Sequence, residues 1–379
     1  MAEQVISPDL SFVKEIINNG GESLKKCFQC ATCSVVCNVT PDNKPFPRKE
    51  MVLAQWGQKD KLLSNPDVWL CHQCSDCTAY CPRGAKPGEV LGAIRKMTIK
   101  TYSSPSALAN MVADSKYLIL LFALPVLIFL GIIGARGYLS GLPEGEIVYA
   151  KLIPVPLIDT VFIAAAVFAV LSFIAGIRKY WAAMSNGVTL RGNLTAHIKD
   201  TIIEILTHKR FKKCNVTQAR STSHLLVFYA FVGLAITTTW AIAYLYGYEI
   251  LGIQASSLFH FGESPYPLYD PMKILGNASA LALLIGMSLV ISNRLKNAEK
   301  AGAGSYFDWL FIVVVTAIMA TGILSELLRL ADIAALAYPI YVTHLVFIFF
   351  LFAYAPFSKM AHMFYRATAM VFAKQAARE

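Results

Sequence analysis

The sequence predicts an all-α protein in which a small cysteine-rich domain precedes a bundle of six membrane-spanning helices. Of its 379 residues, 56% are hydrophobic and only 15% are charged, whereas soluble domains carry about 25% charged residues. Six apolar stretches are long enough to cross about 30 Å of hydrocarbon. Eight of the nine cysteines lie between Cys27 and Cys81. We therefore expect a polar domain at 1–115 and a membrane domain at 116–379.

The first 19 residues contain several charged side chains and no apolar run, so we expect no cleavable signal peptide. The cysteine-rich domain should then stay in the cytoplasm, where thiols are kept reduced. Clustered cysteines in that compartment indicate metal binding rather than disulfide bonds.

The eight clustered cysteines form two copies of one spacing, C-x2-C-x2-C-x3-C. Each copy is the bacterial [4Fe–4S] run, in which three cysteines bind one cluster and the fourth binds the other cluster. Zinc sites more typically use CxxC pairs or a CxxC with two histidines. No thiolate is left for a substrate, which favours an electron relay over a catalytic centre. The two predicted ligand sets are Cys27, Cys30, Cys33 with Cys81, and Cys71, Cys74, Cys77 with Cys37.

The six apolar stretches are expected to form helices at about 117–134, 155–177, 222–246, 271–291, 307–328 and 334–357. With the N-terminal domain inside, sixteen Lys and Arg residues flank the inner ends of these helices, against four in the three outer loops. This positive-inside pattern predicts that both termini face the cytoplasm. It also accounts for the net charge of +10, so we expect no nucleic-acid partner.

The inner loop over 185–220 contains an amphipathic segment. Ile198, Ile202, Ile205 and Leu206 share one helical face, while the charged residues fall elsewhere. We expect this segment to lie at the inner membrane interface as a connector. The alternative is that it docks the cysteine-rich domain or a separate partner protein.

The histidines suggest haem ligands within the helical bundle. His344 and His362 are 18 residues apart, which is five whole helical turns if one helix continues past Pro356. His224, at the inner start of the third span, has the depth of His362, so His224–His362 is the predicted axial pair of an inner haem b. His344 would serve an outer haem with His260 as its candidate partner. A single haem, another sixth ligand, or histidines that merely lie near lipid headgroups stay open.

Candidate quinone-binding groups lie at the outer membrane edge, where side chains able to carry protons would be needed. They are Asp159, Glu326, Asp332 and Tyr341, with His260 in addition. Because carboxylates are common at helix ends, a purely structural role is the alternative for each.

The cysteine-rich domain carries Pro47-Arg48-Lys49, then Trp56-Gly57, then Val68-Trp69-Leu70-Cys71 at the start of the second run. With this pattern, it resembles the small iron–sulfur subunit of heterodisulfide reductases over about residues 20–100. The membrane half, with His224, His344 and His362, resembles the cytochrome b of the nitrate-reductase gamma family. Leu234 departs from that family, which has a second histidine at this position.

The fusion of two such parts resembles the C subunit of the quinone-interacting membrane-bound oxidoreductase (Qmo) complexes of sulfate reducers. This resemblance runs nearly the full length and includes the stretches 207–211 and 223–226. It implies a menaquinone-reactive cytochrome that works with two flavin iron–sulfur partners, Qmo A and Qmo B, and with adenylylsulfate (APS) reductase.

We therefore expect one subunit of a membrane-bound quinone oxidoreductase in the cytoplasmic membrane, and not a complete enzyme. Electrons would pass between menaquinol and the partner subunits by way of haem b and two [4Fe–4S] clusters, with the direction left open. A heterodisulfide-reductase-like or sulfite-reduction-associated membrane complex is the first alternative. A structural membrane anchor for a ferredoxin-like module is the second.

Overall fold

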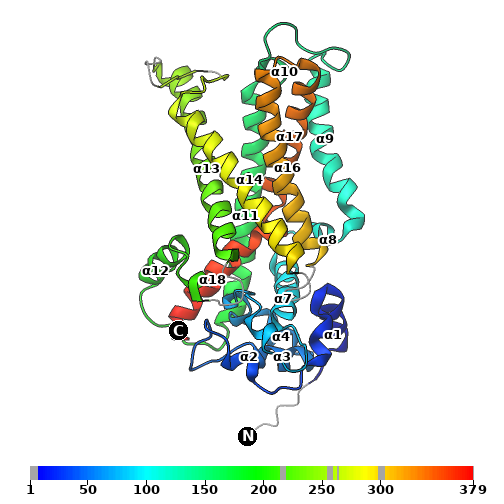
Figure 1. The fold of residues 1–379 in the computed structure, drawn as a ribbon, viewed down its shortest axis with the longest axis vertical. Helices are drawn as coiled ribbons and strands as arrows, with labels where there is room; N and C mark the ends of the chain where they lie inside the picture. The colour runs from blue at the N-terminus through cyan, green and yellow to red at the C-terminus, as the bar shows by residue number, and fades with distance from the viewer. Residues whose placement is uncertain (1–6, 214–218, 254–258, 263, 298–303, 379) are drawn as a thin grey trace.

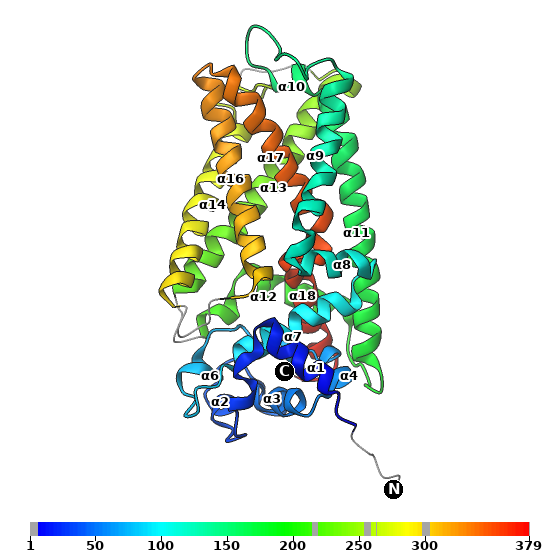
Figure 2. The ribbon, with the colours of Figure 1, turned by 90° about the vertical axis from the view of Figure 1, so that its right-hand side faces the viewer.

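The computed structural model describes residues 7–213, 219–253, 259–262, 264–297 and 304–378. Cys214 and part of the inner loop lie outside these residues. A bundle of long helices forms one end of the molecule, and a domain of short helices forms the other (Figures 1 and 2). The described residues contain helices and no strand, which confirms the all-α prediction.

Among the described residues, six helices are long and apolar enough to cross a membrane. Mean hydropathy over their most apolar windows is 2.0 to 2.9, and only 11 to 33% of each window is buried inside the protein. Most of their apolar surface is therefore left for lipid. The helices coincide with the predicted spans: α9 (Leu118–Ala135), α11 (Val155–Ser185), α13 (Ala219–Leu251), α14 (Pro271–Lys296), α16 (Tyr306–Leu330) and α17 (Ala334–Tyr354).

The long helices pack as a series of neighbours. Helix α13 packs on α14, α14 on α16, and α16 on α17, which also contacts α9 and α11. Small residues let α13 and α14 approach closely, because a Cβ added at Gly286 would lie 2.9 Å from Val227 Cγ2. One apolar core lies between α13, α14 and α16, and Leu234 packs against it. A second core continues from α9, α11 and α17 into the N-terminal domain.

The N-terminal domain is built from short helices around Trp69, which is 2% exposed. The longest, α7, presents Val90, Leu91 and Ile94 to the core, and all three are fully buried. Chain turns between the short helices carry the cysteines. The helices are α1 (Leu10–Ile16), α2 (Thr32–Val35), α3 (Arg48–Gln55), α4 (Lys59–Leu63), α5 (Asp67–Leu70), α6 (Asp76–Ala79), α7 (Pro87–Tyr102) and α8 (Ser106–Ala113).

The chain after the last span does not follow the predicted path. Helix α17 ends at Tyr354, and two 3-10 turns, Ala355–Phe357 and Lys359–Ala361, precede α18 (His362–Gln375). Pro356 has no N–H to donate and its ring opposes a continuous α-helix. Between the turns, Ser358 is extended and its Oγ accepts a hydrogen bond from the Met360 N–H at 3.2 Å. The prediction that His344 and His362 share the face of one helix is therefore wrong.

Helix α18 turns back under the bundle and joins its two ends (Figure 1). It packs against α11, against α5 of the N-terminal domain and against α12 (Leu194–Leu206), the predicted amphipathic segment. Asn193 caps α12 by accepting a hydrogen bond from the Thr195 N–H at 3.0 Å. Ile198 and Ile202 of α12 remain exposed, as a segment at a membrane interface requires. A short helix, α10 (Tyr149–Leu152), lies in the connection between α9 and α11.

Candidate metal centres

The two cysteine runs adopt the same backbone conformation. Gln29 and Ala31 in the first run have φ of 63° and 69°, and Gln73 and Ser75 in the second have 52° and 70°. In each run a short helix, α2 or α6, follows directly and carries the third cysteine. Non-glycine residues rarely adopt positive φ unless their surroundings require it. Its repetition at equivalent positions indicates that both loops are shaped for the same kind of ligand.

The thiols gather in two groups. Burial raises the pKa of Cys33 to about 11, with further contributions from its neighbours Cys27, Cys30 and Cys81. Burial likewise raises the pKa of Cys37 to about 12, and its thiol neighbours are Cys71 and Cys74. The neighbours of each thiol thus include cysteines of the other run, as crossed ligation requires. Thiols with pKa values this high need the positive charge of bound metal to remain thiolates.

The spread of the thiols fits clusters better than zinc. Within the part of the chain that the structure describes, no three His, Cys, Asp or Glu side chains could hold a single metal ion. A zinc site brings all its ligands to about 2.0–2.3 Å from one ion. A cubane cluster instead binds each thiolate at a separate iron atom, so its ligands stand further apart. Groups of neighbouring thiols that do not converge on one point match the second arrangement.

The second cysteine run is bonded to the two helices that carry His224 and His362. Arg366, one turn after His362 in α18, hydrogen-bonds His72 Nε2 with its guanidinium. Because arginine only donates, His72 accepts at Nε2. Burial lowers the pKa of His72, and the charges of Arg366, Arg210 and Arg95 lower it further. Arg220, one turn before His224 in α13, donates to the backbone carbonyl of Gln73. This neighbourhood of cysteine run and histidines could not be read from the sequence.

Each of the three predicted haem histidines has its Nδ1 engaged by the protein. His362 Nδ1 lies 2.5 Å from the Lys359 carbonyl oxygen, and His344 Nδ1 lies 3.0 Å from Thr321 Oγ1. His224 Nδ1 lies 3.1 Å from Nε2 of His208. Ligating histidines usually show this arrangement, because the bond at one nitrogen fixes the ring and leaves the other for the metal. All three rings therefore fit axial ligation of a haem.

His224 and His362 are neighbours although they do not depend on a continuous helix. Burial lowers the pKa of His362 to about 3, with smaller effects from Lys359 and from the nearby His224. The neutral imidazole that results is the form that binds a metal. His208 was expected to lie at the membrane interface, but it is 4% exposed and positions His224.

His344 is held against α16 rather than beside His260. A Cβ added at Gly322 would lie 2.8 Å from His344 Cε1, so the glycine makes room for the ring. His260 is engaged at both nitrogens, with Nδ1 2.9 Å from Asp270 Oδ2 and Nε2 3.4 Å from the Tyr269 hydroxyl. Asp270 in turn caps α14. His260 thus supports the start of α14, and the geometry does not favour it as a partner of His344.

The predicted quinone-binding residues separate into groups. Asp159 accepts a hydrogen bond from the Tyr246 hydroxyl at 2.9 Å and interacts electrostatically with Tyr341. Tyr341 also stacks on Tyr149, with ring centroids 4.2 Å apart. Sequence reasoning missed Tyr246 and Tyr149, because only tertiary packing brings them beside Asp159.

The other two candidates lie elsewhere. Glu326 pairs with Lys273, with Nζ and Oε2 2.7 Å apart. Asp332 is exposed at positive φ in the turn between α16 and α17. Neither contributes to the group around Asp159.

Comparison with known proteins identifies the N-terminal domain. Residues 23–85 match the family model described as 4Fe-4S dicluster domain. The chain therefore contains a dicluster iron–sulfur domain of the electron-transfer class, followed by helices able to cross a membrane.

More particularly, the N-terminal region is similar to the C subunits of heterodisulfide reductases. It is 36% identical over 93 residues to a protein of Archaeoglobus profundus described as like this subunit of heterodisulfide reductase, covering 24% of this chain and 50% of that protein. It is 36% identical over 95 residues to the C subunit of the H(2):CoB-CoM heterodisulfide,ferredoxin reductase of Methanothermobacter marburgensis, with 24% and 50% covered. It is 29% identical over 104 residues to the iron-sulfur C subunit of the CoB--CoM heterodisulfide reductase of Methanopyrus kandleri, with 26% and 54% covered.

These matches concern one domain only. The chain spans about half the length of the curated relatives it matches. No solved structure matches it.

Proposed function

We propose that this chain is the membrane subunit of a quinone oxidoreductase complex and passes electrons between menaquinol and iron–sulfur or flavin partner subunits. One observation carries the proposal. The residues one turn from His224 and from His362, Arg220 and Arg366, are both bonded to the second cysteine run. A haem held by this histidine pair and a cluster held by this run would be close neighbours, as electron transfer needs.

The chain's own residues supply the ligands. Two sets of four cysteines would hold the clusters, the pair His224–His362 would hold an inner haem b, and His344 would serve a second haem. Bound at these sites, the groups would supply one-electron redox chemistry. Thr321, His208 and the Lys359 carbonyl would fix the three rings through Nδ1. Arg366 and Arg220 would hold the second run against the membrane domain.

The group around Asp159 is our candidate for the quinol side of the reaction. Oxidation of a quinol releases two protons with two electrons, so the site needs a proton acceptor. Oδ2 of Asp159, which accepts from Tyr246, could take one proton. The aromatic rings of Tyr149 and Tyr341 offer a flat surface beside it. The positive-inside pattern supports the outer side of the cytoplasmic membrane for this group.

Two finer assignments depend on resemblance. The likeness to the C subunit of Qmo complexes supports flavin iron–sulfur partners and onward transfer to APS reductase. The matched relatives favour a second candidate, a membrane-bound heterodisulfide-reductase-like complex, because their names describe heterodisulfide reductases. Both candidates use the same cofactor sites in this chain.

The proposal is tested by spectroscopy on the purified full-length chain. We expect about eight iron atoms in two clusters, a b-type α band in the reduced-minus-oxidised spectrum, and its reduction by a menaquinol analogue. His224→Ala and His362→Ala should each remove the inner haem, whereas His197→Ala on α12 should not. An intact α band in both variants would refute the inner pair. Haem that a menaquinol analogue does not reduce would refute the quinol link.

A further inference from the structure

The surface around the first cysteine run exposes large apolar side chains. Phe28 follows Cys27 and is 65% exposed, Val35 ends α2 at 83%, Trp56 follows α3 at 53%, and Tyr80 precedes Cys81 at 60%. Cys30 of the same run is also exposed. Four such residues around one redox centre are unusual for a surface that stays in water. We call this surface the first-cluster face: Phe28, Val35, Trp56 and Tyr80 with the segments 25–37, 44–49 and 79–88 that carry or adjoin them.

The first-cluster face is basic. Its three segments contain seven Lys and Arg residues and no Asp or Glu. Two of these cations are fixed at the centre of the face. The Arg83 guanidinium lies over the Phe28 ring, 4.0 Å from its centroid, and Arg48 Nε donates to the Gln29 carbonyl at 3.0 Å. The apolar side chains are therefore surrounded by positive charge.

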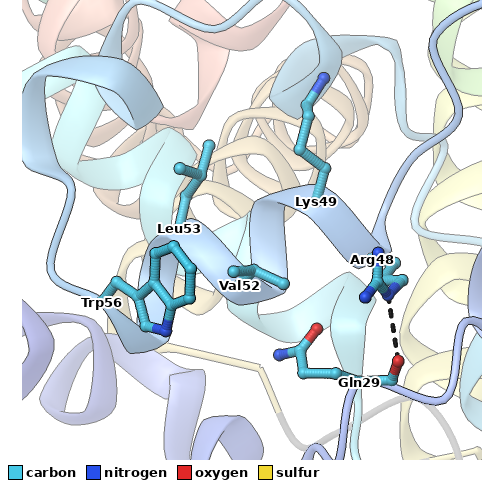
Figure 3. A pocket seen from close by; sticks show the side chains of 6 residues that line it. All are labelled: Gln29, Arg48, Lys49, Val52, Leu53 and Trp56. Carbon is cyan, nitrogen blue, oxygen red and sulfur yellow. Dashed lines mark hydrogen bonds between the residues drawn. The ribbon is translucent and has the colours of Figure 1, made fainter. Parts of the chain in front are cut away.

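Two hollows lie on either side of Arg48 and Lys49. One has a volume of about 390 Å³ and is lined by Gln29, Val52, Leu53 and Trp56 besides these two cations. Figure 3 shows its apolar residues along α3, with Arg48 bonded to Gln29 at one edge. The other, of about 1030 Å³, extends past Val35 and Cys37. Hollows with apolar walls and cationic rims suit the protruding apolar and acidic side chains of a protein partner.

We propose that the first-cluster face docks a soluble electron-transfer protein through an acidic face on that partner. The proposal rests on the proposed function, since electrons that reach the first cluster need a way out. Helices α2 and α3 lie at the end of the molecule away from the helical bundle (Figure 1), so the face is turned away from the membrane in which the bundle would lie. Opposite charge would attract and orient the partner, and the apolar residues would seat it close to Cys30.

The test measures binding of a purified acidic two-[4Fe–4S] ferredoxin to the full-length chain in detergent by calorimetry. We expect saturable binding whose Kd rises with sodium chloride from about 50 to about 300 mM. Arg48→Glu with Arg83→Glu should raise the Kd at least tenfold. The matched control, Lys59→Glu with Lys61→Glu, makes the same charge change on the exposed side of α4. Visible absorbance of the clusters verifies that each variant is folded.

An apolar pair completes the test. Val35→Ser should weaken binding several-fold, whereas Leu10→Ser, which alters a similarly exposed residue on α1, should not. The proposal is overturned if the wild-type chain does not bind the ferredoxin or if the α4 control loses as much affinity as the Arg variant. It is also overturned if the Arg variant lowers binding to phosphatidylglycerol vesicles but not to ferredoxin. Binding without a haem spectrum would refute the proposed function alone, and menaquinol-reducible haem without binding would refute this docking site alone.

Discussion

The carboxylate of Asp67 ties the last residues of the chain to the iron–sulfur domain, and its removal should be costly. Asp67 Oδ2 accepts from Lys49 Nζ at 2.7 Å and from Arg378 Nη2 at 2.6 Å, and the side chain is fully buried. The Arg378 side chain is only 13% exposed, whereas that of Lys49 is 42% exposed and keeps Glu50 as a second partner. Most of the loss should therefore come from stranding Arg378.

Breaking one side of a buried ion pair costs about 3–5 kcal/mol. We take the lower end, about 3 kcal/mol, because Lys49 retains a partner and part of its hydration. For a domain of about 100 residues, 1 kcal/mol shifts the melting temperature by about 4–8 °C. Asp67→Ala should then lower the temperature at which cluster absorbance is lost by about 12 °C or more.

The assay is thermal loss of visible cluster absorbance in the full-length chain. Asp60→Ala, which removes an exposed carboxylate from α4, is the control and should shift the midpoint by no more than a few degrees. Arg378→Met added to Asp67→Ala should cost little more, because the charge that was stranded is gone. Equal midpoints for Asp67→Ala and Asp60→Ala would refute the reasoning.

Three further variants probe the histidines and α12. Gly322→Ala should displace the His344 ring, at about 1–3 kcal/mol, and alter the haem spectrum; Gly131→Ala, which has open space around its Cβ, should change neither, and an unaltered spectrum in Gly322→Ala would count against His344. His208→Ala should weaken haem retention about 10–100-fold by releasing His224, as titration with haem would measure, while retention equal to that of His197→Ala would contradict this. At Glu204, burial raises the pKa, but Arg210 and Lys374 outweigh it and hold the pKa below its usual 4.5. The stabilisation of α12 is thus present above pH 4.5 and lost as the pH falls through the folded-state pKa; hydrogen exchange of α12 should show this in the wild-type chain and not in Glu204→Gln.

The elements that the sequence predicted well are those that local chemistry determines. Each span is set by length and apolar content alone, so α9 to α17 appear close to their expected positions. The cysteine groups follow from spacing, because a run of three thiols separated by two residues can only fold around a common point.

The elements that the sequence mispredicted depend on contacts between distant parts of the chain. The axial spacing of His344 and His362 assumed a continuous helix, and Pro356 with the extended Ser358 breaks it. The partners His208–His224 and Tyr246–Asp159 join residues on different elements, and no periodicity in the sequence marks them. Here the bonds that matter for function are tertiary, and a pattern of residue types carries no record of them.

The position of α18 has a consequence for how this molecule is made. Asp67 and Arg378 are separated by 311 residues, and His72 and Arg366 by 294. Synthesis runs from the N terminus, so the iron–sulfur domain leaves the ribosome before any membrane helix, and α18 follows the last one. The domain must therefore remain undocked while six helices insert, with Asp67 lacking Arg378 until the end of translation. That interval gives the machinery that delivers iron and sulfide open access to the second cysteine run before α18 closes over it.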